Sequence, residues 1–148
     1  MTQKNPQVDL KHMSSCACFN LRKTTRVITQ YYDHSMKSLG LRGTQFTILA
    51  ALSEAKSVTI SHLADFLMMD RTTLTRNLKP LEKQDLLKII PGADQRTREL
   101  RLTRKGHKTF KAAKPLWERT QSEIIDKLGE AKLKKLLFML NETIAITK

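Results

Sequence analysis

Side chains suited to binding a nucleic acid are concentrated between Asp70 and Lys79. The segment supplies hydroxyl, guanidinium and ammonium groups from Arg71, Thr72, Thr73, Thr75, Arg76 and Lys79. An arginine can pair with a guanine edge, threonine hydroxyls donate and accept hydrogen bonds, and a lysine binds phosphate. Because threonine is a poor helix former, three threonines facing outward on one predicted helix favour a binding face over an ordinary solvated one.

A second group of candidate residues follows a turn, where Arg96 and Arg98 come just after Asp94. Arginine side chains near the tip of a hairpin can reach into a narrow minor groove. The simpler alternative is a surface ion pair between Asp94 and Arg96, which would contribute little to stability. The two interpretations are compatible, and we expect Arg96→Ala to weaken binding to every DNA sequence.

Two cysteines, Cys16 and Cys18, stand at the start of a predicted helix, where the helix dipole makes a thiol more reactive. Residues i and i+2 of a helix point in different directions, so a disulfide between them would require that turn to unwind. A cysteine packed in a helix interface is the simpler alternative. Metal binding together with His12 and His34 is another, although the spacing matches no zinc-site pattern.

The composition excludes several classes of protein. The chain has 148 residues, the size of one domain, and a formal net charge of +13, which is typical of a protein that binds a polyanion. No apolar run is long enough for a membrane span, no secretory signal is visible, and two cysteines form no disulfide framework, so we expect a cytoplasmic protein. The sequence has no Gly-rich phosphate loop, H-E-x-x-H sequence or nucleophile elbow, so we expect no enzyme, cofactor or metal.

Hydrophobic periodicity predicts a mainly α fold that would position these side chains. The expected helices cover residues 16–39, 44–54, 59–67, 70–83 and 104–128 and a segment after Gly129, with a hairpin of strands 86–90 and 98–102. Residues 1–15 are polar and are expected to form a flexible arm. Pro80 is expected to bend the last turn of its helix. A short helix, a tight turn, a second helix and a hairpin together predict a winged helix-turn-helix over about residues 41–103.

Several segments, taken in order, resemble the MarR (multiple-antibiotic-resistance regulator) family of transcription factors. They are Gly40-Leu41, Thr44-Gln45-Phe46, Ile60-Ser61-His62-Leu63-Ala64, Asp70-Arg71-Thr72-Thr73-Leu74-Thr75-Arg76, Leu81-Glu82-Lys83, Leu86-Leu87, Asp94-Gln95-Arg96 and Leu102-Thr103-Arg104-Lys105-Gly106. The resemblance rests on their order and spacing over about residues 16–146. Asp85 departs from the pattern, because such sequences usually place Gly after the recognition helix.

The resemblance implies one MarR-like domain over residues 16–148. Its DNA-binding lobe would cover about residues 41–103, and its dimerisation helices residues 16–39 and 104–148. The helix at 70–83 would enter the major groove, Asp94 would pair with basic residues to shape the wing tip, and Arg96 would contact DNA. The expected function is a homodimeric repressor on double-stranded DNA, with operator half-sites about 10 bp apart. The alternative is a nucleoid protein that binds DNA without sequence preference.

The resemblance also implies that an effector releases the DNA. Peroxide-sensing members carry a cysteine at this helix start and a tyrosine fourteen positions later, which Cys18 and Tyr32 match. Those sensors have a further tyrosine where this chain has Arg22, which could stabilise a thiolate instead. A small aromatic ligand is the other effector that the family implies, bound near Tyr31, Tyr32, Phe46 or Trp117, although such residues are more often core.

Overall fold

The computed structural model describes residues 13–147, so most of the predicted arm lies outside the described residues. The first long helix is α1 (Ala17–Met36), followed by the 3-10 helix η1 (Lys37–Leu39). Gly40 ends this segment with a left-handed backbone at φ 65°. The predicted helix at 16–39 and its stop at Gly40 are therefore confirmed.

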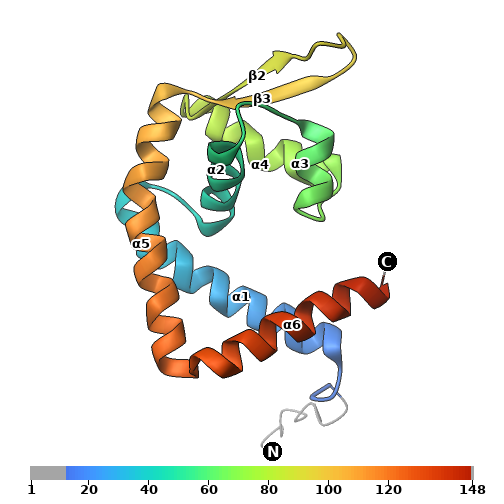
Figure 1. Ribbon diagram of the computed structural model, residues 1–148, viewed down its shortest axis with the longest axis vertical. Coiled ribbons are helices and arrows are strands. Elements are labelled where there is room, and N and C mark those ends of the chain that lie inside the picture. Colours follow the sequence, from blue (N-terminus) through green and yellow to red (C-terminus); the bar gives the residue numbers. More distant parts are fainter. Residues whose placement is uncertain (1–12, 148) are drawn as a thin grey trace, which may run out of the picture.

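Three short helices, the last two of which form the helix-turn-helix, make one compact lobe in Figure 1. They are α2 (Gly43–Glu54), α3 (Ile60–Phe66) and α4 (Arg71–Lys83). The side chains of Thr59 and Asp70 accept hydrogen bonds from the backbone of His62 and Thr73, at 3.1 and 2.8 Å, so both predicted N-caps are confirmed. The tight break before α4 places Met68 at φ 53°.

A three-stranded antiparallel sheet of order β1-β3-β2 completes the lobe. Its strands are β1 (Val58–Thr59), β2 (Leu87–Pro91) and β3 (Arg98–Leu102). The predicted hairpin is confirmed, with Leu87 opposite Leu102 and Ile89 opposite Leu100, although β2 begins one residue later than expected. The strand β1 was not predicted, because two residues are too few to show a period.

The turn from α4 into β2 explains how the chain manages without the expected glycine. Asp85 takes a left-handed backbone at φ 57°, which Asp tolerates better than most residues. Its carbonyl oxygen accepts a hydrogen bond of 2.6 Å from the Thr103 hydroxyl. The departure at this position therefore leaves the helix stop intact.

The two remaining helices are α5 (Arg104–Leu128) and α6 (Glu130–Thr147), joined at Gly129 with φ 90°. The predicted cap is confirmed, since the Thr103 hydroxyl oxygen accepts from the Gly106 amide at 2.9 Å. Pro115 lies inside α5, where its ring removes one backbone hydrogen bond. Figure 1 shows α5 running from the hairpin past α1 to the corner where α6 turns back beneath the lobe.

The core lies in the lobe and extends along α5. Fully buried side chains from α2, α3, α4 and the sheet meet there, namely Ile48, Leu49, Leu52, Leu63, Leu74, Leu78, Leu81, Leu87 and Leu100. Phe46 continues this core toward α5 by stacking on Phe110 and Trp117, with ring centroids 5.6 and 5.9 Å apart. Burial thus fixes the orientation of α4 and of the hairpin.

The chain-end helices are different, because α6 contains no buried residue and α1 buries only Met36. The exposed apolar side chains of the two helices are Leu21, Val27, Ile28, Leu136, Leu137, Phe138, Met139, Ile144 and Ile146. The apolar side chains along α1 are therefore largely uncovered within one chain. No helix within residues 13–147 is long and apolar enough to cross a membrane.

Candidate nucleic-acid interface

The outer face of α4 carries most of the predicted contact residues. Leu74, Leu78 and Leu81 point into the core and are fully buried, which turns the opposite side of the helix to solvent. A shallow groove of about 300 Å³ on that side is lined by Arg71, Thr72, Thr75, Arg76 and Lys79. The structure therefore brings five of the six candidates of this segment together on one exposed surface.

Thr73 is the exception, because its half-buried side chain faces Asp70 instead of the groove. The Thr73 hydroxyl donates to one carboxylate oxygen of Asp70 at 2.6 Å, and the Thr73 amide donates to the other at 2.8 Å. These hydrogen bonds hold the pKa of Asp70 below its usual range. Thr73 thus holds the start of α4 in place.

Two further hydrogen bonds order the first turn of α4. The Arg71 guanidinium donates to the Ser61 hydroxyl, which ties α4 to α3. The Thr75 hydroxyl donates to the Arg71 carbonyl at 2.7 Å. Across residues 13–147, the side chains of Thr72, Arg76 and Lys79 have no such partner. These three therefore present unused hydrogen-bonding groups to solvent.

The wing tip is closed by hydrogen bonds around Asp94. Its carboxylate accepts from the Arg96 amide at 3.0 Å, and its carbonyl accepts from the amide and the hydroxyl of Thr97, each at 2.8 Å. Within the described residues the Asp94 carboxylate thus binds backbone and forms no ion pair with Arg96, and its pairing with basic side chains stays a prediction. The side chains of Arg96 and Arg98 are left exposed.

The candidate redox residues lie along α1. Cys16 occupies the N-cap position and is half-buried, Cys18 is exposed in the first turn, and both are free thiols. Cys18 and Tyr32 are fourteen residues apart on one straight element, or about 21 Å at 1.5 Å per residue. One chain therefore does not bring these two together. Arg22 is exposed one turn after Cys18.

The part of the chain that the structure describes contains no cluster of side chains that would support the alternative of a metal site. No group of three or more His, Cys, Asp or Glu side chains is placed there to hold an ion. His34 stands near the far end of α1 from Cys16 and Cys18, and His12 lies outside the described residues.

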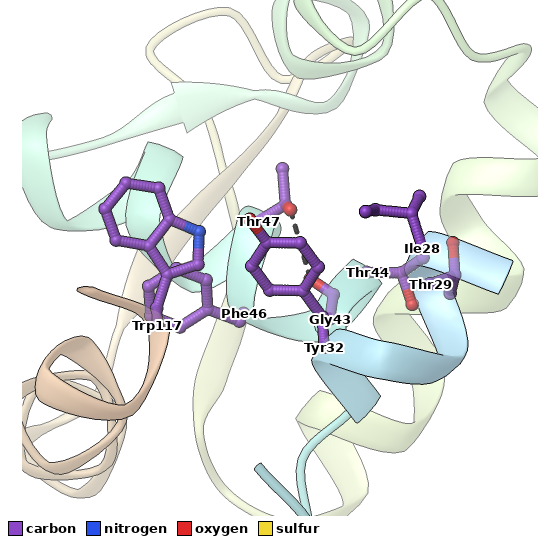
Figure 2. Close-up of a pocket in the computed structure, with 8 residues that line it drawn as sticks. All are labelled: Ile28, Thr29, Tyr32, Gly43, Thr44, Phe46, Thr47 and Trp117. Carbon is purple, nitrogen blue, oxygen red and sulfur yellow. Dashed lines mark hydrogen bonds between the residues drawn. The ribbon is translucent and has the colours of Figure 1, made fainter. Parts of the chain in front are cut away.

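A pocket of about 220 Å³ lies between α1 and the lobe (Figure 2). Its lining residues are Ile28, Thr29, Tyr32, Gly43, Thr44, Phe46, Thr47 and Trp117. In Figure 2 the Tyr32 ring lies between the Phe46 and Trp117 rings on one side and the Ile28 side chain on the other. The Tyr32 hydroxyl donates to the Gln121 side chain, and burial raises the pKa of Tyr32.

Tyr31 lies on a different side of α1, away from this pocket. Its hydroxyl donates to the Glu123 carboxylate and accepts from the Lys127 ammonium at 3.2 Å. The hydrogen bond from Tyr31 is the main reason why the pKa of Glu123 is lowered, and the contact with Tyr31 raises the pKa of Lys127. This α1–α5 contact could not be predicted from local patterns, because the partners are more than 90 positions apart.

Comparisons with known proteins agree with this architecture. Residues 39–96 match the model of the MarR family. The transcriptional regulator SarZ of Staphylococcus epidermidis is 28% identical over 100 residues, which cover 67% of this chain and 68% of SarZ. The structure of the repressor CouR bound to a 23-mer DNA duplex is 26% identical, with a TM-score of 0.80 over 94% of this chain and 99% of CouR.

A fourth similarity covers nearly the whole molecule. The crystal structure of the M. tuberculosis transcriptional regulator MosR in complex with DNA is 33% identical to this chain. The match covers 90% of this chain and 99% of MosR, with a TM-score of 0.80. Together with the family match and the winged helix-turn-helix described above, this similarity shows that the chain belongs to the MarR family of transcription regulators.

Proposed function

We propose that this regulator binds operator DNA by placing α4 in the major groove and the wing in the adjacent minor groove. The observation that carries the proposal is the open row of Thr72, Arg76 and Lys79 on the outer face of α4. Hydroxyl and guanidinium groups suit base edges, and Lys79 suits a phosphate. Arg96 and Arg98 on the exposed wing add the charge that minor-groove binding favours. The structures of the similar proteins MosR and CouR were solved in complex with DNA, which supports duplex DNA as the partner.

We further propose a homodimer that represses transcription from a pseudo-palindromic operator. The exposed apolar side chains of α1 and α6 support the dimer, since Phe138 is 61% and Ile146 82% exposed in one chain. Residues 16–39 and 104–148 would then form the dimerisation part, and residues 41–103 the DNA-binding lobe. Two-fold symmetry would place the two α4 helices one helical turn of DNA apart, about 34 Å.

Duplexes enriched from a random DNA library test the proposal. The purified protein should bind an enriched duplex at least 1,000-fold more tightly than a random one at the same salt concentration. Arg76→Ala should reduce that ratio. Arg96→Ala should instead weaken binding to both duplexes and reduce the slope of log Kd against log salt by the equivalent of about one phosphate contact. A ratio near one for the native protein would favour the nucleoid alternative and reject a sequence-specific regulator.

The proposed effector acts either through the pocket beside Tyr32 or through Cys18. The pocket of about 220 Å³ has aromatic walls that suit a small aromatic molecule. Cys18 is exposed and stands at the start of α1, where a thiol is accessible to an oxidant. Either event would shift the population between dimer shapes with different distances between the two α4 helices.

Operator binding with and without an organic hydroperoxide separates the two effectors. If the thiol is the sensor, the oxidant should release the native protein and leave the Cys18→Ser variant bound. If both proteins stay bound, the oxidant mechanism fails. A phenolic carboxylate that releases native protein but not a Thr47→Trp variant, whose side chain would fill the pocket, would then support the ligand mechanism.

A further inference from the structure

A basic groove lies at the base of the hairpin, apart from the α4 groove and the wing tip. It is a hollow of about 590 Å³ lined by Asp85, Lys88, Thr103, Arg104, Lys105 and Lys108. Two of these residues have internal partners, because Lys105 donates to the Gln84 carbonyl at 2.7 Å and Thr103 to the Asp85 carbonyl. This groove therefore collects four cations and a single carboxylate on one surface.

Three of the cations have no partner among residues 13–147. Lys88, Arg104 and Lys108 are exposed and make neither an ion pair nor a side-chain hydrogen bond there. By contrast, the exposed cations Lys114 and Lys134 have carboxylates one turn away, at 3.9 and 2.7 Å. The basic groove therefore gathers three cations without partners on one small surface, whereas Lys114 and Lys134 are each paired within their own helix.

Two arrangements of charge at this groove oppose the stability of the fold. Lys88 stands directly opposite Arg101 in the β2–β3 register, where like charges repel, and the Glu99 carboxylate, 3.4 Å from the Arg101 guanidinium, offsets part of this repulsion. The first turn of α5 contains Arg104 and Lys105 and no acidic residue, although the positive end of a helix dipole disfavours cations. Unfavourable charge arrangements that occur together at one place are typical of a surface that binds a partner.

The position of the basic groove separates it from the proposed operator contacts. It adjoins the C-terminal end of α4, a 13-residue helix about 20 Å long, whereas Arg71 and Thr72 lie at the other end. The strands carry the wing tip about four residues further, or roughly 13 Å from the base of the hairpin. In Figure 1 the start of α5 and the tip of the hairpin lie at opposite ends of the sheet.

We propose that the basic groove binds phosphates of the duplex DNA that flanks the operator, which thereby curves along the side of the lobe. This inference rests on the proposed function, because it extends the same bound DNA. Phosphates neutralise the unpaired cations and remove the repulsion between Lys88 and Arg101, which offsets the cost of bending the duplex. An acidic protein partner is the competing occupant, and it would leave DNA binding independent of duplex length.

Two duplexes of the same enriched operator test the proposal. One ends at the edges of the operator, and the other has about two further helical turns, or roughly 20 bp, on each side. The native protein should bind the longer duplex at least tenfold more tightly at low salt. Its slope of log Kd against log salt should be steeper by about 2 to 5, at about 0.9 for each phosphate contact.

A variant that removes the three free cations should abolish only the effect of length. With Lys88→Gln, Arg104→Gln and Lys108→Gln together, both duplexes should bind with the affinity that native protein has for the short one, within twofold. The same variant should unfold at an equal or higher temperature than native protein, because it removes repulsive charge. If these three cations served only folding, their removal would not weaken DNA binding while leaving the unfolding temperature unchanged.

The matched control removes three other exposed cations and the same net charge. The triple variant Lys37→Gln, Lys114→Gln and Lys132→Gln should keep the full effect of duplex length. Equal salt slopes for native protein on both duplexes would overturn the inference and leave the proposed function standing. Equal losses on both duplexes for the groove variant would also overturn it. Failure of native protein to bind any duplex would instead reject the proposed function.

Discussion

Met68 holds a left-handed backbone at φ 53° in the turn between α3 and α4, and its side chain is 57% exposed. A side chain with a β-carbon is strained in this conformation, and an exposed methionine gains little from packing to offset the strain. The backbone itself is well held, because the Met68 and Met69 amides donate to Asp65 and Ala64 at 3.2 and 2.9 Å. The turn therefore imposes its conformation on the residue.

Met68→Asn should stabilise the protein, because asparagine adopts the left-handed conformation more easily than methionine. We expect the free energy of unfolding to rise by about 0.5–1 kcal/mol, measured by urea denaturation. Met68→Leu is the matched control and should stay within about 0.5 kcal/mol of native protein. Equal stability of the Asn and Leu variants would show that the conformation is not strained.

Gly106 is required by a close approach between backbones. A β-carbon at this position would lie 1.9 Å from the Leu86 carbonyl oxygen, far closer than two non-bonded atoms can approach. The glycine therefore sets how near the first turns of α5 pass to the chain that leaves α4.

Gly106→Ala should separate α5 from the lobe and lower the free energy of unfolding by about 1–3 kcal/mol, the usual cost of overpacking. Chemical denaturation of the variant beside His107→Ala tests this. His107 is the next residue and is exposed, so its variant should change stability by less than about 0.5 kcal/mol. A Gly106 variant as stable as the His107 variant would contradict the close packing.

The helix α4 depends on its N-cap, and this dependence varies with pH. Hydrogen bonds from Thr73 lower the pKa of Asp70, so the folded state favours the charged carboxylate. A carboxylate whose pKa is lowered on folding stabilises the protein above its unfolded-state pKa, near 3.9. That contribution is lost as the pH falls from this value toward the folded-state pKa.

Asp70→Asn should therefore lower the melting temperature by a few degrees at pH 6, and the difference from native protein should shrink below pH 4. Melting curves between pH 3 and 7 measure the effect. Asp65→Asn removes a neighbouring exposed carboxylate that has no side-chain hydrogen bond among the described residues, and it should show no such convergence. A constant difference across the range would mean that the cap does not depend on charge.

The sequence was a good guide to elements whose signal is local. The caps Thr59, Asp70 and Thr103, the stop at Gly40 and the hairpin all follow from residue types within a few positions. The outer face of α4 followed as well, because Leu74 and Leu78 mark the buried side.

Features that depend on distant contacts could not be predicted. The pairing of Tyr31 with Glu123 joins helices whose relative rotation no pattern reveals. The orientation of Thr73 toward Asp70 was missed because a threonine in a first turn can face either the cap or solvent. The two-residue strand β1 exists only because β3 lies beside it.

At the scale of the whole molecule, a second copy is expected to cover the exposed apolar residues of α6. Replacing Leu137 and Phe138 by lysine together should produce a monomer at micromolar concentration, because buried cations without partners would oppose association. Sedimentation velocity measures the oligomeric state. Native protein that is itself monomeric at this concentration would contradict the proposed dimer.

The same double variant should retain the native helix content, since none of its substitutions falls in the core. The control places lysine at two polar positions of α6, Asn141→Lys and Glu142→Lys. Both positions are exposed on the same helix and should leave the dimer intact. Dissociation in this control would assign the effect to net charge.

Pro115 lies inside the continuous helix α5, and its position has a mechanical consequence. About eleven residues, or roughly 17 Å of helix, lie between Pro115 and the base of the hairpin, while Trp117, Gln121 and Glu123 lie on the other side. A proline concentrates bending at its own position because one hydrogen bond is missing. A change of about 10° in that bend moves the base of the hairpin by roughly 3 Å. Bending of α5 is therefore expected to centre on Pro115, which lies close to the aromatic pocket, and to be felt most at the wing.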